Sequence, residues 1–139
     1  MIDYTDLIGC PFVGSGRDPK TGLDCYGLAK EIFRRYGYEI PEYDEDYTDV
    51  PKVTRLMKTG LQESCWERID SNTEPDEPSL IAIRFGVPQP FINHVGVYIG
   101  HGKFIHTREN TGVVVEQVNS PVWRHVIEGF YRYKGAKNV

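Results

Sequence analysis

The feature that most constrains the fold is a series of strand-like segments in the C-terminal part of the chain. Five segments rich in Val, Ile, Phe and Tyr are separated by Gly, Asn and Pro, a pattern typical of short antiparallel strands. They are Leu80–Phe85, His94–Ile99, Lys103–Thr107, Val113–Val118 and Val126–Tyr133. Because one helical segment precedes them, the sequence predicts an α+β domain in which a helix packs against a central antiparallel sheet.

That helix is predicted to begin at Asp24. Apolar side chains recur every three or four residues from Cys25 to Tyr36, and charged side chains occupy the opposite face. Asp24 is a favourable N-cap, and Gly37 is a favourable C-terminal stop. The prediction places Cys25 in the first helical turn, beside unpaired N–H groups and the positive end of the helix dipole.

This position of Cys25 favours nucleophilic chemistry. The N–H groups there stabilise a thiolate, and also the oxyanion that forms when sulfur attacks a carbonyl. The carboxylate of Asp24 opposes the thiolate, so a nearby imidazolium is needed to outweigh it. A structural role is the alternative, because Cys25 also lies on the apolar stripe of its helix and buried free cysteines are common. Cys10 and Cys65 complete neither a disulfide framework nor a CxxC metal pattern, and Cys10 is interpreted as a small buried residue.

Two histidines supply partners for this cysteine. Residues 94–107 are predicted to form a β-hairpin whose turn consists of residues 100–102. With this three-residue turn, Gly96 lies opposite His106, and His94 becomes the diagonal neighbour of His106 on the same face, ~7–8 Å away. Gly96 leaves room for the two rings to meet. A two-residue turn would instead place the rings on opposite faces.

Together these residues form a predicted triad. Cys25 is the nucleophile, His94 is the base, and His106 orients the base. Isolated histidines in strands are more often structural, and the same three side chains are also a possible zinc site. No fourth zinc ligand is evident and none of the usual metal-site spacings occurs, so no metal or other cofactor is predicted.

Charge and hydropathy limit the class of partner. The net charge of −4 argues against a protein that binds nucleic acid by neutralising phosphates. No apolar run approaches the ~20 residues that span a bilayer, so no membrane partner is expected. Leu7–Cys10 resembles a lipoprotein processing site, but residues 2–6 contain two acids and no base. We therefore expect no signal peptide and synthesis in the cytoplasm.

The length of 139 residues predicts a single domain. Residues 39–79 are polar and acidic, which is typical of a solvated surface, although a rim or lid over a site is the alternative. Within this segment, a short helix is predicted over residues 51–59, and a further element carries Cys65, Trp66 and Ile69. The acidic, Pro-rich run at 74–78 is predicted to be a loop.

The order of these motifs resembles the NlpC-type cell-wall cysteine peptidases, a papain-like family. A Gly- and Pro-containing loop with Phe12 leads to Asp-Cys-Tyr-Gly-Leu at 24–28, and then come His-Val-Gly-Val-Tyr-Ile-Gly at 94–100 and Phe-Ile-His at 104–106. The resemblance covers most of the chain outside 39–79, which becomes a family-variable insertion in one NlpC-type domain, 1–139. It implies that Cys25 attacks a peptide carbonyl, that His94 takes its proton and that His106 holds His94.

The resemblance also implies a substrate, the stem peptide of peptidoglycan, which the family commonly cleaves between D-glutamate and a diamino acid. Residues 36–43 and 127–133 are similar to the branch found in tailed phages and prophages. That branch implies phage tail proteins as partners. It also implies delivery by the virion to the bacterial cell wall, and the expected absence of a signal peptide agrees with this.

Four residues near the triad are candidates for substrate binding: Asp24, Tyr26, Phe12 and Gly96. Tyr26 stands where the family usually has a small Ser, and it is expected to crowd the site. Phe12 stands where many members carry a Tyr that helps to recognise the free end of the substrate. Gly27 lies inside the helix at a cost of ~1 kcal/mol relative to Ala, which predicts a close approach there by another chain segment or a substrate.

Two alternatives to a peptidoglycan peptidase are consistent with the sequence. One is a catalytically silent phage tail or wall-binding component on the same fold, which the unusual Tyr26 favours. The other is a hydrolase or acyltransferase acting on a different amide or ester. The shape of the groove sets substrate choice, and residues 39–79 are expected to shape the groove.

Overall fold

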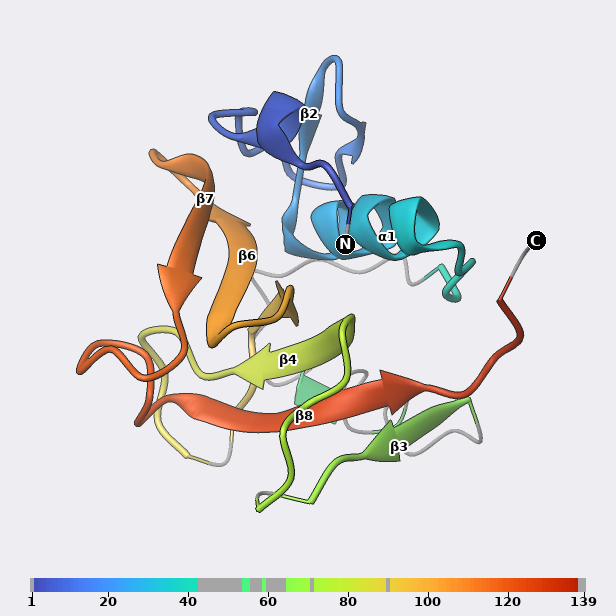
Figure 1. Cartoon of the computed structure of the whole chain (residues 1–139). Coiled ribbons are helices and arrows are strands. Elements are labelled where there is room, and N and C mark those ends of the chain that lie inside the picture. The colour runs from blue at the N-terminus through green and yellow to red at the C-terminus, as the bar shows by residue number, and fades with distance from the viewer. Residues whose placement is uncertain are drawn as a thin grey trace.

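The computed structural model describes residues 2–42, 54–55, 59, 65–70, 72–89 and 91–137. One helix lies over an antiparallel sheet, and the N-terminal segment lies beside the start of that helix (Figure 1). The predicted α+β fold class is therefore confirmed. Of the helix predicted over 51–59, only residues 54, 55 and 59 are described, and all three are helical. The acidic run at 43–49 lies outside the described residues.

The N-terminal segment forms a small layer of its own. It contains the 3-10 turn η1 (Thr5–Leu7) and a two-stranded ribbon of β1 (Arg17–Asp18) and β2 (Gly22–Leu23). The thiol of Cys10 is buried beneath it, 3.3 Å from the carbonyl oxygen of Pro19, which confirms the prediction of a buried Cys10. Strand β2 leads directly into the helix.

Helix α1 (Cys25–Tyr36) has both of its predicted ends. The carboxylate of Asp24 accepts a hydrogen bond from the N–H of Gly27 at 2.7 Å. Gly37 ends the helix in the left-handed conformation, with φ at 99°, and its N–H donates to carbonyls of the last turn. The apolar side of α1 packs on the centre of the sheet, against β5 and β6.

The main sheet has six strands in the order β3-β8-β4-β5-β6-β7, and every neighbouring pair is antiparallel. The strands are β3 (Trp66–Arg68), β4 (Ser79–Ile83), β5 (His94–Tyr98), β6 (Lys103–Arg108), β7 (Gly112–Gln117) and β8 (Ile127–Tyr133). The last five match the predicted segments to within two residues at each end. The predicted element at residues 65–69 is β3, and residues 74–78 form a loop as predicted.

Apolar side chains cover both faces of the sheet. On one face, Val95 and Val97 belong to the large cluster that includes the apolar side of α1. On the other face, Tyr98 and Phe104 form a second cluster with Trp123, which comes from the segment between β7 and β8. Because side chains alternate along a strand, the even-numbered residues of β5, beginning with His94, belong to this second face.

Gly27 lies where a loop of the N-terminal segment touches the first turns of α1. A Cβ atom at Gly27 would lie 2.0 Å from the carbonyl oxygen of Gly16. The predicted close approach is therefore made by another segment of the same chain. The same oxygen accepts a hydrogen bond from the backbone N–H of Asp24 at 3.3 Å, so the contact joins the loop to the helix start.

We expect Gly27→Ala to lower the free energy of unfolding by about 1–3 kcal/mol, the range found for overpacked interiors. The blocking atom belongs to the backbone, so the loop or the helix start must move, and this outweighs the better helix propensity of Ala. Urea denaturation measures the effect. The control is Gly14→Ala, because a Cβ at Gly14 meets nothing within 4 Å. Equal losses of stability in both variants would contradict the argument.

Candidate active site

Cys25 and His94 line the same cavity, which has a volume of about 380 Å³. Cys25 is the first residue of α1 and His94 is the first residue of β5, so the cavity joins the start of the helix to the start of a strand. Both side chains are buried. The other lining residues are Phe12, Phe85, Asn93, Thr107, Arg108, Glu109 and Asn110.

The β5–β6 hairpin has the predicted register. Val97 pairs with Ile105, and the N–H of Ile99 donates to the carbonyl of Lys103 at 3.0 Å. The three turn residues, Gly100, His101 and Gly102, have φ angles of 90°, 55° and 74°. This left-handed backbone suits glycine, which occupies two of the three positions. The predicted three-residue turn is therefore confirmed.

The register brings the two histidine rings into direct contact. The Nε2 atom of His94 lies 2.9 Å from the Nδ1 atom of His106. Gly96 lies beside this pair, and a Cβ there would be 3.3 Å from the Cβ of His106. A Cβ there would also be 3.0 Å from the ring of Phe104, so the lack of a side chain at Gly96 avoids crowding against β6. Its proposed contact with substrate is not supported, because Gly96 is buried and does not line the cavity.

Glu116 extends the histidine pair by one more residue and was not predicted. It lies on β7 opposite Phe104, two pairs along from His106 and therefore on the same face, and its carboxylate hydrogen-bonds the Nε2 atom of His106. The ring of Trp123 packs against His106, with centroids 4.7 Å apart. The alternation along β7 predicts which face Glu116 occupies. It gave no sign of a role, because an acidic residue on an edge strand is usually exposed to solvent.

Burial sets the protonation of the two rings. It lowers the pKa of His94 to about 3, and the positive charges of His106 and Arg108 contribute in the same direction. Burial also lowers the pKa of His106, although the hydrogen bond with Glu116 opposes that shift. Both imidazoles are therefore neutral near pH 7, and neutral His94 has the form required of a proton acceptor.

Asp24 is buried and does not line the cavity, so its position does not support the predicted contact with substrate. Only 1% of its side chain is exposed. Its oxygens accept the N–H groups of Ser15 at 3.1 Å and Gly27 at 2.7 Å, and the guanidinium of Arg17 lies 2.6 Å away. Because Arg17 compensates the charge of Asp24, the expected opposition to a thiolate at Cys25 is weaker than the sequence suggested.

The structure also corrects the expectation that Tyr26 crowds the site. Its ring is buried in the main core and its hydroxyl donates to the carbonyl of Pro41. The guanidinium of Arg17 lies 5.8 Å from the centre of the ring. Tyr26 does not line the cavity, whereas Phe12 does, as its predicted role near the substrate requires.

Two further lining residues, Phe85 and Arg108, were missed: Phe85 lies just beyond β4 and Arg108 is the last residue of β6, and neither position by itself indicates a role in the site. Phe85 is 36% exposed, and its ring centre lies 5.7 Å from that of His94. The side chain of Asn93 bonds both the N–H and the carbonyl of Phe85, at 2.7 and 2.8 Å. The guanidinium of Arg108 lies 5.1 Å from the ring centre of Phe85 and 5.7 Å from that of Trp123.

The sequence profile that matches this chain is that of the NlpC/P60 family, and it covers residues 9–132. The chain belongs to the NlpC/P60 family. The expectation drawn from the sequence motifs is thereby confirmed at the level of the family. The phage-tail branch stays a prediction.

Relatives of this NlpC/P60 chain include two named enzymes. It is 28% identical over 142 residues to the murein DD-endopeptidase MepS/murein LD-carboxypeptidase of Escherichia coli (strain K12), a match that covers 100% of this chain and 61% of the relative. It is 25% identical over 127 residues to the gamma-DL-glutamyl hydrolase of Bacillus subtilis (strain 168), covering 91% of this chain and 27% of the relative. The chain thus spans less than two thirds of either relative.

Solved structures support the fold. An NlpC/P60 family protein from Bacillus cereus has a TM-score of 0.64 at 24% identity, and the match covers 93% of this chain and 37% of that protein. A lipoprotein-like NLP/P60 family protein from Staphylococcus aureus has a TM-score of 0.63 at 21% identity, covering 94% and 38%. At these identities the likeness concerns the NlpC/P60 fold alone.

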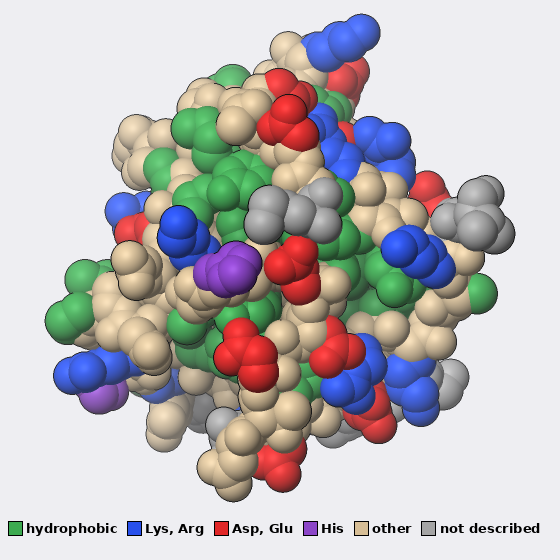
Figure 2. Space-filling view, viewed as in Figure 1, with side chains coloured by type: hydrophobic (Ala, Val, Ile, Leu, Met, Phe, Trp, Pro, Cys, Tyr) green, Lys and Arg blue, Asp and Glu red, His purple; other side chains and the backbone are tan. Residues whose placement is uncertain are grey.

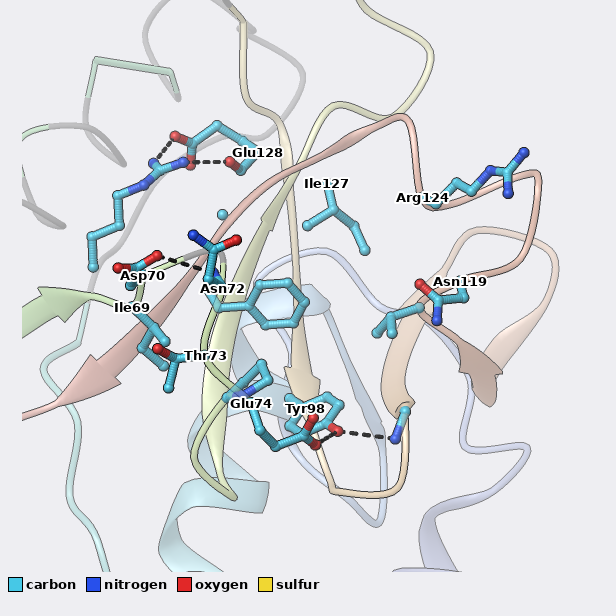
Figure 3. A pocket seen from close by; sticks show the side chains of 16 residues that line it. Ile69, Asp70, Asn72, Thr73, Glu74, Tyr98, Asn119, Arg124, Ile127 and Glu128 are labelled. Carbon is cyan, nitrogen blue, oxygen red and sulfur yellow. Dashed lines mark hydrogen bonds and ion pairs between the residues drawn. The ribbon is translucent and has the colours of Figure 1, made fainter.

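A larger cavity of about 830 Å³ lies elsewhere on this NlpC/P60 domain (Figure 3). Its lining contains no cysteine or histidine. Several of its polar groups bond one another: Arg68 pairs with Glu128, and the hydroxyl of Tyr98 donates to Glu74. Of these two cavities, the smaller one is lined by both a cysteine and a histidine.

The charged side chains of this domain are mixed in sign where they are seen at the surface. On the face shown in Figure 2, acidic and basic side chains are interspersed. Within the described ranges, no group of three or more His, Cys, Asp and Glu side chains is placed to hold a metal ion. No helix in the described part of the chain has the length and apolar character needed to cross a membrane.

We expect Asp24→Ala to lower the free energy of unfolding by about 2 kcal/mol or more, above the usual loss for an N-cap, because Arg17 also loses its buried partner. Thermal or urea denaturation measures the change. Asp24→Asn keeps an oxygen for the N–H of Gly27 but removes the charge, so its loss should be smaller. A loss in Asp24→Asn as large as in Asp24→Ala would show that capping contributes nothing.

Proposed function

We propose that this chain is a cysteine peptidase that hydrolyses peptidoglycan stem peptides, with Cys25 as nucleophile and His94 as base. The observation that carries the proposal is that Cys25 and His94 line one cavity while His94 lies 2.9 Å from His106. The relatives named as a murein endopeptidase and a glutamyl hydrolase support the same class of substrate.

The proposed reaction passes through a thioester. Neutral His94 takes the proton of Cys25 as the sulfur attacks the peptide carbonyl, and the oxyanion is stabilised by N–H groups of the first turn of α1. The C–N bond then breaks, and His94 gives the proton to the leaving amine. A water molecule activated by His94 attacks the thioester, which releases the acid and restores the thiol.

Arg108 supports cleavage next to D-glutamate. A γ-linked D-glutamate has a free α-carboxylate close to the scissile bond, and a guanidinium binds a carboxylate with charge-assisted hydrogen bonds. Arg108 lines the cavity, and in the part of the chain that the structure describes its Nε atom is buried without a hydrogen-bond partner. Glu109 lines the same cavity but is exposed.

The alternatives are weaker but testable. The silent wall-binding component was favoured by Tyr26, and this residue points into the core. We extend the proposal to a phage or prophage origin, with phage tail proteins as partners and action at the bacterial cell wall. The basis is the resemblance of residues 36–43 and 127–133 to the family branch found in tailed phages and prophages. Digestion of purified peptidoglycan, followed by identification of the fragments, separates the proposed bond from other amides and esters.

We expect Cys25→Ala to reduce the cleavage of purified muropeptides by at least about 10³-fold, because no other group can form the thioester. Chromatography of the digested muropeptides measures this, and circular dichroism should show an unchanged fold. The matched control is Cys65→Ala, which should retain activity because Cys65 does not line the cavity. Undiminished cleavage by Cys25→Ala would eliminate the proposed chemistry.

We expect Arg108→Gln to raise KM by about 10-fold or more for a peptide with a free D-glutamate α-carboxylate. This change corresponds to the loss of one hydrogen bond to a charged group. Steady-state kinetics on this peptide and on its α-amidated analogue measure the effect. Amidation should weaken binding to the wild type but make little difference to Arg108→Gln.

The control for this experiment is Arg124→Gln. Arg124 is an exposed arginine that lines the larger cavity, so its loss should leave both KM values unchanged. If amidation reduces binding equally in the wild type and in Arg108→Gln, then Arg108 does not bind this carboxylate.

A further inference from the structure

Three side chains on neighbouring strands form a continuous hydrogen-bonded chain that ends at the cavity. The carboxylate of Glu116 on β7 bonds the Nε2 atom of His106 on β6, and the Nδ1 atom of His106 lies 2.9 Å from the Nε2 atom of His94 on β5. The Nδ1 atom of His94 takes no part in these hydrogen bonds. Cys25 is the cysteine that lines the cavity together with His94.

The direction of each hydrogen bond follows from the acid at the end of the chain. Burial of Glu116 opposes its ionisation, but hydrogen bonds from Trp123 and His106 outweigh this and lower its pKa. An ionised carboxylate only accepts hydrogen bonds, so the proton of neutral His106 is on Nε2. The Nδ1 atom of His106 is then an acceptor, and the proton of neutral His94 is on its Nε2 atom.

We propose that Glu116 is a positioning residue that, through His106, keeps the Nδ1 atom of His94 unprotonated and ready to take the proton of Cys25. This inference rests on the proposed function, and it adds a residue outside the predicted triad. When His94 takes the proton it becomes an imidazolium with protons on both nitrogens, and no other proton in the chain has to move. The negative charge of Glu116 then stabilises the new positive charge.

The surroundings of Glu116 support this role. Its side chain is 31% exposed, whereas the ring of His106 is fully buried, so the carboxylate reaches the ring from the solvent side. Trp123 is buried against the same ring, so His106 is held between the ring of Trp123 and the carboxylate of Glu116. Arg108 acts against Glu116, because its positive charge lowers the pKa of both histidines and so disfavours an imidazolium. A carboxylate beside His106 partly offsets this effect.

Glu116→Gln tests the proposal, because an amide keeps the size of the side chain but removes its charge. An amide can also donate a hydrogen bond to His106, which reverses both tautomers and places a proton on the Nδ1 atom of His94. We expect kcat for muropeptide cleavage to fall by about 10- to 100-fold, the usual effect of losing such an outer partner, with KM nearly unchanged. Glu116→Asp keeps the charge and should recover part of kcat.

The decisive readout is the reactivity of Cys25 itself. The rate of its alkylation by iodoacetamide is followed across pH, with mass spectrometry to distinguish it from Cys10 and Cys65. In Glu116→Gln the midpoint should move to higher pH by about one unit, because the imidazolium that forms when His94 takes the thiol proton has lost a negative charge near it. The control is Glu67→Gln, an exposed carboxylate on β3 at the opposite edge of the sheet, which should leave the midpoint unchanged.

Nitrogen NMR of the histidine rings in the unmodified protein gives a second, independent measurement. The proposal requires the proton of His94 to be on Nε2, and a proton on Nδ1 would overturn it, as would an unchanged alkylation midpoint in a folded Glu116→Gln variant. If the wild type cleaves no peptidoglycan fragment, the proposed function fails. The alkylation and NMR results still decide the role of Glu116.

Discussion

The pairing register between β5 and β6 is the constraint on which the site depends. Three residues with left-handed backbone close this hairpin, and the turn places Gly96 opposite His106. A shift of one residue would move His106 to the face that packs on α1 and would separate it from His94. The register between β6 and β7 then places Glu116 on the same side. The alignment of three strands thus assembles the whole hydrogen-bonded chain.

The nucleophile is positioned by a separate set of interactions. Asp24 caps α1, and its buried charge is compensated by Arg17 from the N-terminal ribbon. The absence of a side chain at Gly27 lets the loop at Gly16 approach the helix start. These contacts fix where the helix begins, and therefore where Cys25 lies. Charge compensation also removes an electrostatic obstacle to a thiolate that the sequence alone suggested.

Burial and charge act in opposite directions in this site. Enclosing two histidines beneath aromatic rings lowers their pKa values and keeps them neutral. This suits a base that accepts a proton, but it makes the resulting imidazolium costly. Glu116 lies at the far end of the chain, where it can stabilise that charge without contacting the substrate. Arg108 is on the cavity side, where a positive charge suits an acidic substrate.

Local patterns in the amino-acid sequence were enough to predict several elements of this fold. Apolar periodicity with Asp24 and Gly37 located the helix, and strand alternation with glycines in the turn located the hairpin and its histidine pair. Which further side chains meet at the site depends on how separate elements pack together. The sequence pattern places Glu116 and Phe85 in strands but does not show that they or Arg108 meet the histidines and the cavity. Tyr26 was wrongly expected to crowd the cavity, because the direction of a side chain depends on packing with segments distant in the chain. The periodicity of a sequence predicts which face of a helix or strand a residue occupies. The neighbours of that residue in space depend on how separate helices and strands pack together.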